Sequence, residues 1–163
     1  MAQRVETDDM TGLYNKTSTR QHIEQLLMER TDQKYGFIIF DIDNFKQVND
    51  QYGHAAGDNV ICAFAKTIRA RIPADAVAGR IGGDEFVVFM PFNEPGQLQE
   101  TIKALSHALN RDYVIGNLSL HSTASIGAAV APKDGIDFDT LYRNADAALY
   151  QTKERGKNGY TIY

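Results

Sequence analysis

The chain has 163 residues, which suits one domain with a single hydrophobic core and is too short for two independent ones. Its 43% hydrophobic and 23% charged residues are typical of a soluble globular protein, and no apolar run approaches the roughly 20 residues needed to cross a bilayer. The net charge of -4 argues against a nucleic-acid partner, so we expect a small anionic ligand held by a few local Lys and Arg side chains.

The chain begins with a short polar stretch that lacks the apolar segment of a signal peptide. We interpret residues 1–7 as a linker remnant and residues 8–163 as one catalytic domain. The single cysteine, Cys62, excludes an internal disulfide and is compatible with a cytoplasmic location. A polar turn at 8–15 precedes an amphipathic helix predicted over 17–29.

The next segment is predicted to be the centre of a sheet. Residues 35–42 are apolar on both faces, as expected for a strand buried on both sides, and Asp41 lies at its end. Helices are predicted over 44–52 and 55–72, with a break at Gly53 and an end at Pro73.

A β-hairpin is predicted next, with strands at 76–80 and 86–90 and Gly82-Gly83 at its tip. Glycines tolerate positive φ and have no Cβ, so a bulky anion can approach the backbone there. Asp84 and Glu85 follow at once with hard carboxylate oxygens. Such a sequence is most often only a solvated turn, so the hairpin alone does not establish a site.

The remaining elements are a helix near 97–109, a long strand over 118–130, a helix over 138–154 and an edge strand over 159–163. Strands and helices alternate, but the hairpin places antiparallel strands at the centre. We therefore predict an α+β fold with a palm-like, antiparallel or mixed central sheet flanked by helices.

Asp41 could form a metal site together with the two acids of the hairpin. If the strand that ends at Asp41 lies beside the hairpin, three carboxylates converge, and they would bind Mg²⁺ that shares its coordination sphere with substrate phosphates. We expect the side chain of Asp43 to point to the opposite face from Asp41, which favours a structural hydrogen bond for it over a metal role. A strand-end cap is the alternative for Asp41.

Four ordered motifs resemble the diguanylate cyclases named after the Gly-Gly-Asp-Glu-Phe signature, the GGDEF family. The signature itself is at 82–86, and the other matching segments are 8–15, 40–50 and 52–58. The resemblance covers nearly the whole chain. It implies Asp41, Asp84 and Glu85 as catalytic carboxylates and metal ligands, with the Ile42 carbonyl as a backbone ligand and Mg²⁺ or Mn²⁺ as the cofactor.

The resemblance also implies that Asn49 and Asp58 read the guanine edge of GTP. A carboxylate accepts from the N1–H and N2–H₂ groups of guanine, which adenine does not offer. A helix end for Asn49 and an N-cap for Asp58 are the alternatives.

Six residues are phosphate candidates. Lys153 and Lys157 are four apart and share a face if the last helix runs through Gly156, although the family tends to have Arg at the second position. Backbone amides at a helix start are natural phosphate donors. The full set is Asn44 and Phe45 through their amides, and Lys46, Lys153, Lys157 and Arg80 through their side chains.

The function implied is condensation of two GTP into cyclic di-GMP with release of two pyrophosphates, across a homodimer. We also expect an N-terminal sensory or dimerising region, with or without a tether to the inner membrane face, and no membrane contact from the domain itself. A silent receptor for GTP or cyclic dinucleotide, and a cyclase with another substrate, are the alternatives. Where many relatives carry Arg-x-x-Asp for product inhibition, residues 73–76 read Pro-Ala-Asp-Ala, so no product-inhibition site is expected.

Overall fold

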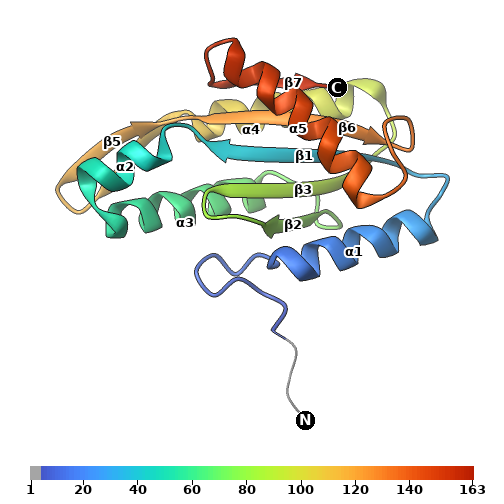
Figure 1. The fold of residues 1–163 in the computed structure, drawn as a ribbon, viewed down its shortest axis with the longest axis horizontal. Helices are drawn as coiled ribbons and strands as arrows, with labels where there is room; N and C mark the ends of the chain where they lie inside the picture. Colours follow the sequence, from blue (N-terminus) through green and yellow to red (C-terminus); the bar gives the residue numbers. More distant parts are fainter. Residues whose placement is uncertain (1–4) are drawn as a thin grey trace.

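A five-stranded sheet forms the centre of the computed structural model, which describes residues 5–163 (Figure 1). Its strand order is β2-β3-β1-β6-β7, and only the β6–β7 pair is parallel. The α+β fold with a mixed central sheet is confirmed. The first four residues of the expected 1–7 linker lie outside the described part.

The strands are β1 (Lys34–Ile42), β2 (Val77–Arg80), β3 (Glu85–Phe92), β4 (Arg111–Ile115), β5 (Leu118–Ser122), β6 (Ala124–Ala131) and β7 (Gly159–Ile162). The helices are α1 (Lys16–Glu29), α2 (Phe45–Tyr52), α3 (His54–Ala70), α4 (Pro95–Leu109) and α5 (Phe138–Glu154). No helix in residues 5–163 is both long and apolar enough to span a membrane.

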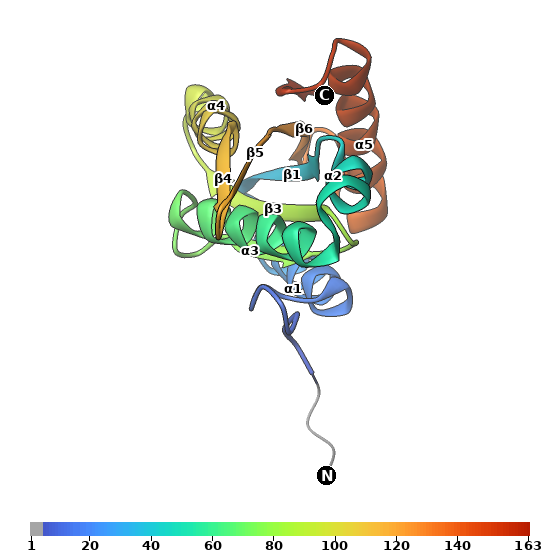
Figure 2. The ribbon, with the colours of Figure 1, turned by 90° about the vertical axis from the view of Figure 1, so that its left-hand side faces the viewer.

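Strand β1 divides the interior into two apolar layers. Ile38, Phe40 and Ile42 face the layer made with α3 and α4, whereas Phe37 and Ile39 face the layer made with α1 and α5. Figure 2 shows α5 and α4 on opposite sides of the sheet. Because side chains alternate along a strand, the carboxylate of Asp41 lies on the α5 side.

The expected single strand over 118–130 is wrong. The chain breaks at Thr123, and β5 pairs with β4 in a separate hairpin instead of continuing into β6. Burial alternates along β5, whereas seven of the eight residues of β6 are buried, and the loose alternation expected over 118–130 joined these two different strands into one. Strand β4 was not predicted because only Tyr113 of its five residues is buried, which leaves no periodic signal.

Candidate active site

The carboxylates of the site come together because β1 and β3 are antiparallel neighbours. Asp41 lies opposite Glu85 in the register, and the Ile42 amide donates to the Asp84 carbonyl over 3.2 Å. Glu85 shares its strand face with Val87 and Phe89, which pack in the α5 layer. The predicted meeting of the first strand with the hairpin is therefore observed.

Among the acids of this site, Asp84 has the largest shift in pKa. Burial is the largest cause, and a hydrogen bond with Asp41 and the charge of that carboxylate add to it, so that the pKa of Asp84 rises to about 6. Burial also raises the pKa of Glu85, although a bond from the Tyr142 hydroxyl works against the shift. Two adjacent carboxylates with raised pKa values favour a bound cation.

Lys153 supplies the nearest positive charge. Its ammonium bonds to Oδ2 of Asp41, with 40% and 20% of the two side chains exposed. Burial alone would lower the pKa of Lys153, but the bond to Asp41 outweighs it and the pKa is raised. The last helix thus places a cation directly over the end of β1.

Asp43 has the structural role expected of it. Its carboxylate accepts from the hydroxyls of Thr123 and Ser125, each over 2.6 Å, and from the amide of Asn158 over 3.0 Å. These bonds join the end of β1 to β6 and to the segment before β7. Asp43 is 6% exposed and is fully engaged.

The donor set at this end of β1 fits Mg²⁺. Within residues 5–163, no three acidic, histidine or cysteine side chains already surround one point. Mg²⁺, however, is usually bound through one or two carboxylates together with substrate phosphates and water. The mutually repelling pair of Asp41 and Asp84 provides hard oxygens of that kind.

The two guanine candidates lie on facing helices. Gly57 approaches α2 so closely that a Cβ there would come within 1.9 Å of Oδ1 of Asn49, which places the Asn49 amide beside the residue preceding Asp58. Asn49 is half-buried within α2, and Asp58 is exposed in α3. The cap alternative for Asp58 is wrong, because Gly53 precedes the first residue of α3.

The phosphate candidates surround the start of α2. Asn44 precedes this helix in the left-handed region (φ 56°), and its side chain accepts from Nζ of Lys157 over 2.8 Å. Lys46 is exposed on the same helix. The helical face expected to be shared by Lys153 and Lys157 is not formed, because α5 ends at Glu154 and Lys157 follows it with a positive φ of 65°. The first amides of a helix, here from Phe45 onward, have no acceptor within the helix and can bind an anion.

Arg80 has a different environment from the other candidates. Nη2 and Nε donate to the Gly83 carbonyl over 2.8 and 3.1 Å, and Nη1 lies 3.2 Å from Oδ1 of Asp8. In this structure the guanidinium ties the hairpin tip to the N-terminal loop. An approach to a phosphate, as the sequence suggested, would require it to leave these partners.

The glycines at the hairpin tip do not use the positive φ that was expected of them, since neither is among the residues with positive φ. A Cβ on Gly83 would meet nothing within 4 Å, whereas one on Gly82 would lie 3.3 Å from Cβ of Glu85. The tip is therefore open at Gly83, in keeping with the expected approach of a bulky group.

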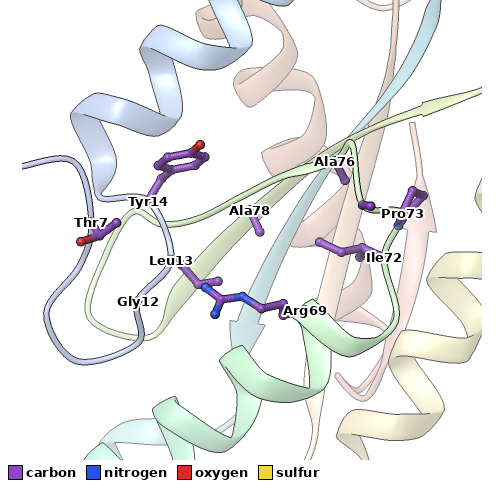
Figure 3. A pocket seen from close by; sticks show the side chains of 10 residues that line it. Thr7, Gly12, Leu13, Tyr14, Arg69, Ile72, Pro73, Ala76 and Ala78 are labelled. Atoms are coloured by element: carbon purple, nitrogen blue, oxygen red, sulfur yellow. The ribbon is translucent and has the colours of Figure 1, made fainter.

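A cavity of about 420 Å³ lies between the N-terminal loop, the end of α3 and β2 (Figure 3). Pro73 and Ala76 line it, and these are the two ends of the segment 73–76 at which no product-inhibition site is expected. Arg69 is the only cation lining it within residues 5–163.

Comparison with known protein families identifies the family of this chain. Residues 5–159 match the family described as "Diguanylate cyclase, GGDEF domain", and the chain belongs to that family.

Two curated relatives and one solved structure illustrate the match. The bifunctional diguanylate cyclase/cyclic di-GMP phosphodiesterase MucR of Pseudomonas aeruginosa is 36% identical over 96% of this chain and 23% of its own length. The diguanylate cyclase DgcS of Shewanella oneidensis is 35% identical over 99% of this chain and 54% of its own length. The GGDEF domain of DgcB from Caulobacter crescentus, solved with c-di-GMP, superposes with a TM-score of 0.90 at 27% identity, covering 99% of this chain and 98% of that one. The chain spans about a quarter to a half of these curated relatives.

Sequence reasoning missed two contributors to the site, Tyr142 and Asp8. Tyr142 precedes Lys153 by three helical turns, so both lie on one face of α5. This periodicity is the sequence signal that could have identified Tyr142. Asp8 belongs to a matched motif, but no pattern in the sequence indicates its pairing with Arg80.

Proposed function

We propose that this domain is an active diguanylate cyclase. It condenses two GTP into cyclic di-GMP and releases two pyrophosphates. The observation that carries the proposal is the pair of adjacent carboxylates, Asp41 and Asp84, beside an open hairpin tip and a lysine. A silent receptor would not need this costly cluster of like charges, because repulsion between carboxylates destabilises the fold.

Each protein group has a role in that reaction. Asn49 and Asp58 bind the guanine edge, and the amides at the start of α2 with Lys46 and Lys157 bind the phosphates. Lys153 releases Asp41 and pairs with the triphosphate when nucleotide enters. Mg²⁺ or Mn²⁺, held by Asp41, Asp84, Glu85 and the Ile42 carbonyl, would neutralise the triphosphate and polarise the α-phosphorus.

Asp84 accepts the proton in the reaction we propose. The 3′-hydroxyl oxygen of one GTP attacks the α-phosphorus of the other, pyrophosphate leaves, and the hydroxyl proton passes to Asp84. Without metal the pKa of Asp84 is raised to about 6, nearer to the working pH that suits a base than the pKa of an ordinary aspartate, and a cation bound beside it would lower that pKa. A second attack of the same kind closes the ring.

The reaction needs two copies of the domain. One site holds one GTP, so two sites must face each other, and the active species we propose is a homodimer. The chain spans only part of its curated relatives, which is consistent with a pairing or sensory region elsewhere in a longer protein. We place the domain in the cytoplasm, where GTP is available.

Product identification tests the proposal. The protein is incubated with Mg²⁺ and GTP, and in parallel with ATP, and the products are identified by mass. We expect cyclic di-GMP from GTP and no cyclic product from ATP. Tight GTP binding without turnover would favour the receptor, and a product from ATP would favour a cyclase of another specificity.

A further inference from the structure

Tyr142 contacts the site although it has no role in the reaction outlined above. Its hydroxyl donates to Oε1 of Glu85 over 2.5 Å, and the two residues come from α5 and β3. Both are half-buried. The bond therefore joins the last helix directly to the acid of the hairpin.

Aromatic packing fixes the position of that hydroxyl. The Tyr142 ring stacks on Phe138 with centroids 6.1 Å apart and meets the edge of Phe37 at 6.4 Å, while those two rings are 5.2 Å apart. Phe37 is fully buried and Phe138 is 5% exposed. A ring held between a strand and its own helix leaves its hydroxyl little freedom.

The bond in turn restricts Glu85. With Oε1 engaged, Oε2 lies on the Gly82 side, 3.8 Å from where a Cβ on Gly82 would be. Asp41 lies opposite on the neighbouring strand and repels the Glu85 carboxylate. Without the hydroxyl, this repulsion would rotate Glu85 away from Asp41 or free both of its oxygens.

We propose that Tyr142 is a positioning residue, which holds Glu85 so that Oε2 alone is presented to the divalent cation. The inference rests on the proposed function, because it requires the cation site at Asp41 and Asp84. Mg²⁺ demands near-ideal octahedral geometry, whereas Ca²⁺ accepts carboxylates through one or both oxygens. A carboxylate with one oxygen already bonded therefore favours Mg²⁺ over Ca²⁺.

Tyr142→Phe tests this directly, because it removes the hydroxyl and keeps the ring between Phe37 and Phe138. Tyr150→Phe is the matched control, since Tyr150 lies on the same helix and is 63% exposed. Mn²⁺ binding is followed by its paramagnetic resonance signal with a slowly hydrolysed GTP analogue present, and Mg²⁺ and Ca²⁺ compete for the site. Melting temperatures check that the variants fold.

We expect Tyr142→Phe to bind Mg²⁺ about tenfold more weakly, because losing the partner that orients a metal ligand typically lowers metal affinity by about that factor. The loss of Ca²⁺ affinity should be smaller. The kcat with Mg²⁺ and GTP should fall by about 10- to 100-fold while KM for GTP stays within about twofold. Tyr150→Phe should match the parent protein.

Unchanged Mg²⁺ affinity in Tyr142→Phe, or equal losses for Mg²⁺ and Ca²⁺, would overturn the positioning role and leave the proposed function standing. A parent protein that binds no Mn²⁺ with the GTP analogue present would overturn the cation site itself, and the inference with it.

Discussion

Arg80 and Asp8 form an ion pair, with Nη1 and Oδ1 3.2 Å apart, that joins residues 72 positions apart in the chain. Only 15% and 21% of their side chains are exposed. Burial alone would raise the pKa of Asp8, but bonds from the hydroxyl and amide of Thr11, together with Arg80, lower it. The N-terminal loop is thereby fastened to the hairpin that carries Asp84.

Arg80→Ala should destabilise the fold by about 1–3 kcal/mol, because it leaves the Asp8 carboxylate and the Gly83 carbonyl without their partner. Arg80→Lys should be intermediate, since Lys keeps the charge but lacks the planar fork. The free energy of unfolding in urea measures both. Lys103→Ala, which removes an exposed cation from α4, should change it by less than about 0.5 kcal/mol. Equal stability of Arg80→Ala and the parent protein would refute the fastening role.

The raised pKa of Asp84 predicts how stability depends on pH without added divalent metal. The ordinary pKa is 3.8 and the folded value is about 6, so the unfolded chain ionises first and the fold loses stability as pH rises between these values. Asp84→Asn removes this penalty. Its free energy of unfolding in urea should equal that of the parent below pH 3.8 and exceed it above pH 6 by about 1 kcal/mol, after allowance for solvent screening. A difference that does not vary with pH would contradict the shift.

Asp58→Ala should weaken GTP binding by about 1–3 kcal/mol and relax discrimination against ATP, because the guanine N–H donors would lose their acceptor. Calorimetric titration with both nucleotides measures it. Asp50→Ala is the matched control, since it removes an exposed acid from α2. If GTP and ATP bind alike to the parent protein, the base assignment fails.

Product should inhibit only by competition at the active site. The segment 73–76 offers no guanidinium to grip a phosphate and no carboxylate at its last position to hold guanine, because these positions hold Pro73 and Ala76. Calorimetry with cyclic di-GMP, with the active site saturated by a GTP analogue, is the measurement. A tight binding event that disappears when residues 73–76 are replaced would show the prediction wrong.

Sequence patterns predict the parts of this site that depend on local periodicity. The turn signal correctly placed the hairpin. The assignment of Asp43 to the face opposite Asp41 is wrong, because residues two apart on a strand share a face, and Ser125, which donates to Asp43, lies opposite Asp41 in the register. The bonds from Tyr142 to Glu85 and from Lys153 to Asp41 depend instead on how α5 is rotated and placed over the sheet. That placement is set by packing between layers, which no single segment encodes.

The most direct test measures cyclic di-GMP and pyrophosphate in the same reaction with Mg²⁺ and GTP. A dimeric coiled coil is fused ahead of the domain, so that association of two domains does not limit the rate of cyclic di-GMP formation. We expect two pyrophosphates per cyclic di-GMP, loss of both products in Asp41→Asn and Asp84→Asn with the fold intact, and normal rates in Asp50→Asn. Absence of product from the paired parent domain, or near-normal turnover by either active-site variant, would contradict the account.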